Sequence, residues 1–125
     1  MILDTNAVSA LNEGDPSIVG ALSSARRHSV PVVVLGEFRA AILGSRIASQ
    51  MQVWLDRFER EFEILDVTSD TSRHYADIRH HLKKMGRPIP VNDVWIAALA
   101  REHHLAILTR DRHFENVPNI TCVGW

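Results

Sequence analysis

Short apolar runs alternate along this chain with longer segments in which apolar residues recur every three or four positions. The short runs predict strands at residues 2–3, 30–35, 64–67, 105–108 and 120–123. The second run contains Val32-Val33-Val34, and a continuous β-branched run is typical of a strand that is buried on both faces. Polar residues follow each run, so the predicted strands are short.

The segments between these runs predict helices. We expect a short helix at residues 7–11 and a second one opened by Asp15-Pro16, because Asp can cap a helix and Pro suits its first position. A further helix is predicted at residues 38–43, and a longer one at residues 47–62, where apolar residues recur at spacings of three, four or seven. The helix that Asp15-Pro16 opens, over residues 15–25, is expected to bury an apolar stripe of Ile18, Val19, Leu22 and Ala25.

Two more helices are predicted in the second half of the chain. Ser69 or Asp70 can cap the first, whose expected buried face is Tyr75, Ile78, Leu82 and Met85, and Gly86 ends it. The second opens at Asn92-Asp93 and is apolar almost all round from Val94 to Ala100. A helix of that composition is expected to be central and packed on most sides.

Strands that alternate with helices predict a parallel sheet covered on both faces. We therefore expect an α/β fold in which a single domain, residues 1–125, forms three layers (α/β/α). Its central parallel sheet should have about five short strands.

Acidic residues follow several of the predicted strands. Open parallel sheets bind ligands beyond the carboxyl ends of their strands, and Asp4, Glu37 and Asp111 follow the first, second and fourth strands. Asp93 opens the helix that leads into the fourth strand, and its first turn need not lie at that edge. Each acid also has a structural alternative: Asp93 as a helix cap, Glu37 as a helix-start acid and Asp111 as a turn residue. For Asp4 the structural alternative is weaker, since packing rarely requires an acid directly after a core strand.

The four acids make chemical sense as a set. Carboxylates brought close together repel one another, and a divalent cation removes that conflict. Oxygen ligands favour Mg²⁺ or Mn²⁺, and the neighbouring polar residues that could support such a site are Thr5, Asn6, Asn92 and Thr109. A carboxylate-bound metal suits phosphoryl transfer. The adjacent pairs His80-His81 and His103-His104 point to different sides of a helix, so they do not indicate zinc.

Composition and charge exclude some classes of protein. Hydrophobic residues make up 46% and charged residues 23% of the 125 residues, as in ordinary globular proteins. The formal net charge is −1, so any contact with nucleic acid must come from a local patch. No phosphate-binding glycine loop is present, which argues against a nucleotide-cofactor enzyme. The only cysteine, Cys122, cannot form an internal disulfide.

The location follows from what the sequence lacks. No stretch is long and apolar enough to cross a membrane, and no signal-like segment precedes the first predicted strand. Cytoplasm is the expected compartment.

The motifs resemble those of the PIN-domain family. The likeness covers essentially the whole chain and rests on Met1-Ile2-Leu3-Asp4-Thr5-Asn6, Glu37, Asn92-Asp93-Val94-Trp95-Ile96-Ala97-Ala98 and Leu108-Thr109-Arg110-Asp111-Arg112-His113-Phe114. The size is similar to that of VapC toxins of bacterial toxin–antitoxin pairs. The resemblance implies Mg²⁺- or Mn²⁺-dependent RNA cleavage at Asp4, Glu37, Asp93 and Asp111. In that case Asp4 and Asp93 are the main metal ligands, and Asn6 and Thr109 are supporting residues. It also implies a homodimer and a cognate antitoxin that covers or enters the acidic pocket.

Contacts to RNA are less well defined by the sequence. The candidates flank the motifs: Arg39, Arg87, Arg110, Arg112 and His113. Each arginine could equally be a solvated surface residue, and a lone histidine is more often structural. Trp54, Phe58 and Phe62 are expected in the core or at a dimer surface, with an antitoxin groove as a secondary alternative.

The leading hypothesis is a toxin endoribonuclease that cleaves a structured RNA, such as tRNA or rRNA, with a metal-activated water. One alternative is an RNA- or partner-binding domain without catalytic turnover, favoured by the weak net charge. Another is a phosphatase of a different α/β family, although the Asp-x-Asp pair of one such family is absent because Asn6 follows Asp4-Thr5.

Overall fold

Five short parallel strands form one sheet in the computed structural model, which describes residues 1–125. In spatial order they are β3 (Glu63–Leu65), β2 (Ser29–Pro31), β1 (Ile2–Leu3), β4 (Ile107–Leu108) and β5 (Cys122–Val123). Every neighbouring pair is parallel. The carboxyl ends of all five strands therefore meet at one edge, and the predicted parallel sheet is confirmed.

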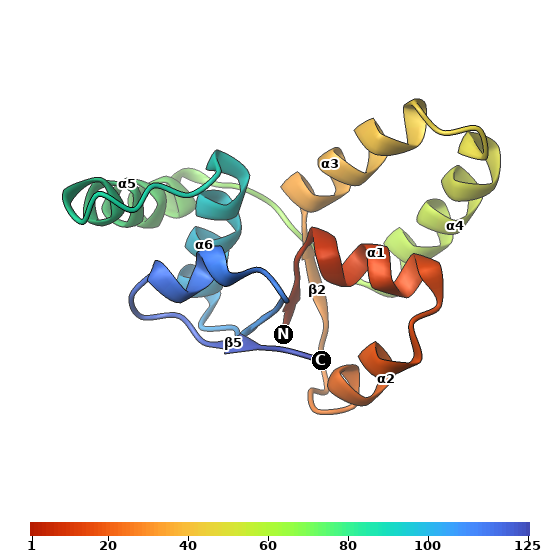
Figure 1. The fold of residues 1–125 in the computed structure, drawn as a ribbon, viewed down its shortest axis with the longest axis horizontal. Coiled ribbons are helices and arrows are strands. Elements are labelled where there is room, and N and C mark those ends of the chain that lie inside the picture. Colours follow the sequence, from red (N-terminus) through yellow and green to blue (C-terminus); the bar gives the residue numbers. More distant parts are fainter.

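Helices cover the sheet on both sides, which confirms the expected three-layer α/β/α arrangement (Figure 1). Figure 1 shows α3 and α4 as a hairpin on one side of the molecule and α5 packed against α6 on the other. No helix is long and apolar enough to pass through a membrane. The helices are α1 (Thr5–Glu13), α2 (Pro16–Leu22), α3 (Val32–Leu43), α4 (Ala48–Glu61), α5 (Ser69–Lys84), α6 (Val91–His103) and the short 3₁₀ helix η1 (Arg112–Asn116).

The core is built around the two central strands and α6. Ile2 and Leu3 of β1, and Ile107 and Leu108 of β4, are fully buried, as expected for strands covered on both faces. Helix α6 buries six residues between Val94 and Ala100, so the prediction of a central helix there is confirmed. The carboxyl ends of β1 and β4 and the start of α6 are therefore anchored in the core.

The predicted second strand is wrong beyond its first two residues. Strand β2 ends at Pro31, and the β-branched run from Val32 to Val34 forms the first turn of α3. Pro31 has no N–H group to continue the ladder, and its φ of −61° with extended ψ makes it the N-cap of the helix. Among the residues that α3 buries, Val34, Phe38 and Ile42 lie four apart, and this helical stripe outweighs the high strand propensity of valine.

Smaller differences concern helix ends and exposed apolar residues. Thr68, rather than Ser69 or Asp70, caps α5, and it exchanges hydrogen bonds with Thr71. Met85 was predicted on the buried face of that helix but is 49% exposed, because it is already the C-cap residue. Val19 is likewise exposed on α2, where Ile18 alone is buried.

Helix α6 begins at the carboxyl edge of the sheet and returns to the start of β4. Its first turn therefore lies beside the ends of β1 and β4, and Figure 1 shows the first turns of α1, α3 and α6 converging there. Asp93, in this first turn, therefore lies at the same carboxyl edge as the other three acids. Because α6 leads into the start of β4, it runs back against the strand direction, and its N-terminus lies at the edge where ligands bind.

Candidate functional site

Asp4 is the most deeply buried acid of the molecule, with 3% of its surface exposed. It follows β1 directly and caps α1, since its Oδ1 accepts a hydrogen bond of 2.8 Å from the backbone N–H of Ala7. Its Oδ2 accepts a hydrogen bond from the hydroxyl of Thr109. Burial nevertheless raises the pKa of Asp4 from 3.8 to about 6, and the nearby charges of Asp111 and Asp93 add to that rise.

Thr109 connects two of the acids. While its hydroxyl donates to Asp4, the same oxygen accepts a hydrogen bond of 2.8 Å from the backbone N–H of Asp111. Asp111 in turn caps η1 by accepting from the backbone N–H of His113 at 2.9 Å. Asp111 therefore caps a short helix and also belongs to the group of acids.

Glu37 extends inward from the second turn of α3, not from the end of a strand. Its Oε2 accepts a hydrogen bond from the hydroxyl of Thr5. Its Oε1 accepts one of 2.5 Å from the amide of Asn92. These bonds join α1, α3 and α6 at their N-terminal ends and fix the orientation of the carboxylate.

Asp93 lies in the first turn of α6, half-buried at the wall of the same pocket. Burial raises its pKa, and the charges of Asp111 and Glu37 act in the same direction, while the hydrogen bond from His113 opposes them. The Nδ1 atom of His113 lies 3.2 Å from Asp93 Oδ2 and 3.1 Å from Asp111 Oδ1. A ligand atom from each of these three residues lies within 4.8 Å of the others.

All four predicted acids line one pocket of about 480 Å³, which we call the acidic pocket. Of the predicted supporting residues, Thr5 and Asn6 also line this pocket. Asn92 and Thr109 do not line it, but they donate hydrogen bonds to Glu37 and Asp4, respectively. Reasoning from sequence missed Ala40 and Pro90 as lining residues. Ala40 is three positions after Glu37 on a helix and Pro90 directly precedes α6, so the observed helix boundaries explain both.

The donor set of the acidic pocket has the chemistry of a divalent-cation site. Four carboxylates face one imidazole, and two of the carboxylates have raised pKa values because burial and mutual repulsion disfavour their charged forms. Asp93, Asp111 and His113 each offer a ligand atom within 4.8 Å of the others, and Asp4 and Glu37 line the same pocket. Hard oxygen ligands predominate, and a bound cation would relieve the repulsion among them.

The four candidate arginines do not line the acidic pocket. Arg39 turns to α4, where it pairs with Glu59 and Asp56. Arg110 packs over the ring of Trp125, and Arg112 pairs with Glu115. Arg87 donates to Asn116 at 3.3 Å. Of the predicted RNA contacts, only His113 reaches the pocket, because the arginines adjoin the motifs in sequence but point away from them in space.

The fold and the arrangement of acids agree with comparisons to known proteins. The PIN domain family matches residues 1–120, and this chain belongs to that family. The chain is 32% identical over 116 residues to ribonuclease VapC5 of Mycobacterium tuberculosis, a match that covers 90% of this chain and 84% of the relative. It is 29% identical over 129 residues to ribonuclease VapC2 of Rickettsia felis, covering 99% and 96% of the two chains.

A solved structure shares the whole architecture. The crystal structure of VapBC2 from Rickettsia felis, bound to a DNA fragment from its promoter, contains a chain that superposes with a TM-score of 0.91 at 27% identity. The match covers 99% of this chain and 97% of that chain. The resemblance read from the sequence motifs is therefore confirmed at the level of family and fold.

Proposed function

We propose that this chain is a metal-dependent endoribonuclease and the toxin of a VapBC-type toxin–antitoxin pair. The observation that carries the proposal is the convergence of Asp4, Glu37, Asp93 and Asp111 on one pocket at the carboxyl edge of the sheet. Relatives named as VapC ribonucleases support it, since the similarity extends over nearly the whole chain.

Mg²⁺ or Mn²⁺ is the proposed cofactor, held by the four carboxylates with Asp4 and Asp93 as the main ligands. When bound, such an ion activates a water molecule and stabilises negative charge on a phosphate. The protein's own contribution is orientation. Thr109 holds Asp4, and Thr5 and Asn92 hold Glu37 by hydrogen bonds. Fixed carboxylates of this kind reorganise little during a reaction, which is a requirement for efficient electrostatic catalysis.

His113 is the one pocket residue that can carry positive charge. Its contacts to Asp93 and Asp111 keep these two carboxylates close together despite their repulsion. We propose that it contacts the RNA backbone when the pocket is occupied, because half of its side chain is exposed to solvent. A structured RNA such as tRNA or rRNA is the proposed substrate.

The proposed partners are a cognate antitoxin and a second copy of this chain, and the proposed compartment is the cytoplasm. The solved VapBC structures similar to this chain are toxin–antitoxin complexes, which supports the antitoxin. An acidic pocket whose walls carry no arginine or lysine is electrostatically suited to a cationic side chain from such a partner.

Replacement of Asp93 by Asn tests the proposal. The substitution keeps the size of the side chain while removing one charge, so the fold should persist. Cleavage of an RNA pool in Mg²⁺ should fall by about a hundredfold or more, since even loss of a residue that only supports a metal ligand costs about 10–100-fold. Glu13→Gln, an exposed acid at the end of α1, is the matched control and should cleave normally. Cleavage by Asp93→Asn at the wild-type rate would contradict the proposal. Binding of RNA by the wild type without any cleavage would instead favour a domain without turnover.

A further inference from the structure

A second pocket lies beside the acidic pocket, on the other side of the segment that leads into α6. We call it the loop pocket. It has a volume of about 390 Å³ and apolar walls that include Leu82 of α5, Ile89 of the connecting segment and Val91 of α6. Arg79 and Lys83, both on α5, complete its rim. Its size and mixed lining are those of a site for a small planar group with a nearby negative charge.

The two pockets share a wall. Ile89 and Val91 line the loop pocket, whereas Pro90 between them lines the acidic pocket. These three residues are consecutive, so both pockets adjoin the same short segment of backbone. A nucleotide whose phosphate lies at the carboxylates would have its base next to this segment.

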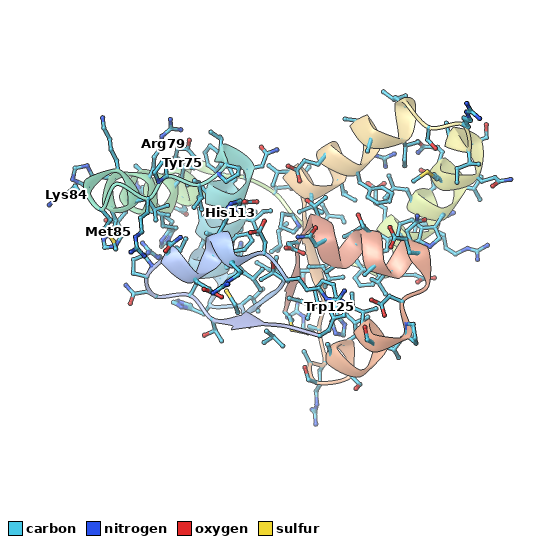
Figure 2. All side chains as sticks on the ribbon, in the orientation of Figure 1. Tyr75, Arg79, Lys84, Met85, His113 and Trp125 are labelled. Carbon is cyan, nitrogen blue, oxygen red and sulfur yellow. The ribbon has the colours of Figure 1, made fainter.

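The loop pocket also provides the local positive charge that a chain of net charge −1 needs to hold RNA. No Asp or Glu occurs from residue 78 to residue 92, while this stretch carries Arg79, Lys83, Lys84 and Arg87. Neither Arg79 nor Lys83 takes part in a salt bridge, so both remain available to a phosphate. Figure 2 shows Arg79 beside Tyr75 on α5, Lys84 and Met85 at the far end of that helix, and His113 nearer the centre of the molecule.

Arg79 is held in place at this rim. Its guanidinium donates a hydrogen bond to the hydroxyl of Tyr75 and lies 5.8 Å from the centre of that ring. The ring of Tyr75 is itself stacked on Trp95 of α6, with a centroid separation of 3.9 Å. The cation is thus preorganised by packing between α5 and α6, which lowers the entropic cost of binding an anion.

We propose that the loop pocket binds the base of the RNA nucleotide adjacent to the phosphate held at the acidic pocket. This inference rests on the proposed RNA cleavage and deepens it by assigning a base subsite. The aliphatic walls of Ile89 and Val91 cover the faces of the base, and Arg79 and Lys83 attract the flanking phosphate. The enzyme therefore needs a base, and not only a sugar-phosphate chain, next to the bond that it cuts.

Short single-stranded oligoribonucleotides with one abasic nucleotide, moved in steps across the cut site, test the subsite. For the wild type we expect kcat/KM to fall by about tenfold, equivalent to about 1.4 kcal/mol, when the abasic position adjoins the cut bond, and little elsewhere, because only there is a base lost from the pocket. A wild-type enzyme that is indifferent to the abasic position would overturn the proposal.

Two pairs of variants make the test specific to the pocket. Val91→Phe fills it from the wall, and Val19→Phe places the same side chain on exposed α2 as a control. Lys83→Gln removes a rim charge, while Lys84→Gln removes a neighbouring charge that does not line the pocket. We expect Val91→Phe to lose the penalty for the abasic substrate and Lys83→Gln to raise KM more than Lys84→Gln does. If the two variants of each pair had the same abasic penalty and the same KM, the base subsite would be contradicted.

A binding measurement separates failure of the subsite from failure of the proposed function. Methyl NMR signals of Leu82 and Ile89 should shift on titration with nucleoside monophosphates, and Val91→Phe should abolish these shifts. Shifts without any RNA cleavage would support the base subsite while refuting the nuclease. RNA cleavage without NMR shifts and without a base requirement would support the nuclease and refute the base subsite. Dissociation of a dimer by Val91→Phe, with base-independent cleavage, would assign the pocket to a protein interface and overturn the inference.

Discussion

The hydroxyl of Thr109 donates a hydrogen bond to the buried carboxylate of Asp4, although the two residues are 105 positions apart in the sequence. Strands β1 and β4 are direct neighbours, with Leu3 opposite Leu108, so the residues that follow each strand meet at the edge of the sheet. This contact anchors Asp4, the most buried acid of the pocket.

Thr109→Val should destabilise the protein and reduce RNA cleavage. Valine has the shape of threonine but cannot donate to Asp4 or accept from the backbone N–H of Asp111, which leaves buried polar groups unpaired. We expect the free energy of unfolding to fall by about 1–3 kcal/mol in a denaturant titration. Thr109→Ser keeps the hydroxyl and should lose much less, and equal losses in the two variants would show that the methyl group, not the hydrogen bonds, matters.

Asp4 should make the metal-free protein less stable as the pH rises. Its pKa is about 6 in the folded protein against an ordinary value of 3.8, so the folded state binds the proton more tightly than the unfolded chain does. The stability that this proton provides is complete below the ordinary pKa and is lost as the pH passes through about 6, with a total near 3 kcal/mol at most. Asp4→Asn does not titrate, so in EDTA its stability relative to the wild type should increase over this pH range.

Asp15→Asn provides the control for this pH prediction. Hydrogen bonds from Ser17, and then from Trp125, lower the pKa of Asp15, so its charged form is favoured in the folded protein. The wild type should therefore gain stability relative to Asp15→Asn as the pH rises through the acid range, which is the opposite direction. A common pH dependence of both variants would indicate that burial of Asp4 is not the cause.

Binding of Mg²⁺ or Mn²⁺ should raise the Tm of the wild type near neutral pH. A ligand that binds only the folded state at a hundred times its Kd stabilises it by about 2.7 kcal/mol. Asp4→Asn and Asp93→Asn should show a much smaller rise in differential scanning fluorimetry, whereas Glu13→Gln should respond like the wild type. If all four proteins respond alike, the ion acts elsewhere than at the acidic pocket.

Asn92→Asp should weaken activity more than Asn92→Ala does. The amide of Asn92 donates to Glu37, and an aspartate in its place would put a negative charge against that carboxylate. Loss of the bond alone should cost about tenfold in kcat/KM, and the added repulsion should cost more at low metal concentration. A rise in metal concentration should partly restore Asn92→Asp but not Asn92→Ala, and identical responses would argue against this explanation.

The sequence was informative where one signal predominated. The alternation of apolar runs and helical stripes predicted the parallel sheet and its flanking helices, and the acids Asp4 and Asp111 were correctly placed at strand ends. It failed at residues 32–34, where a β-branched run suggested a strand. The helical spacing of Val34, Phe38 and Ile42 decided the outcome there, because burial of a whole helix face outweighs local propensity.

Other features depended on contacts between distant segments. Arginines near the motifs in sequence turned to partners such as Glu59 and Glu115, since the direction of a side chain is set by packing rather than by its position in a motif. The rim of Arg79 and Lys83 was not identified from the sequence, although the acid-free stretch around it was a visible signal.

The sequence by itself determined the layered α/β fold and the identity of the four acids, because periodicity and residue type are local properties. Only the tertiary structure decided that Asp93 joins the other three and that His113 lies between Asp93 and Asp111. It also decided that Thr109 holds Asp4 and that Pro90 separates two pockets. These relationships arise where β1, β4 and α6 meet. The three elements are far apart in the sequence, so local patterns do not reveal the contacts between them.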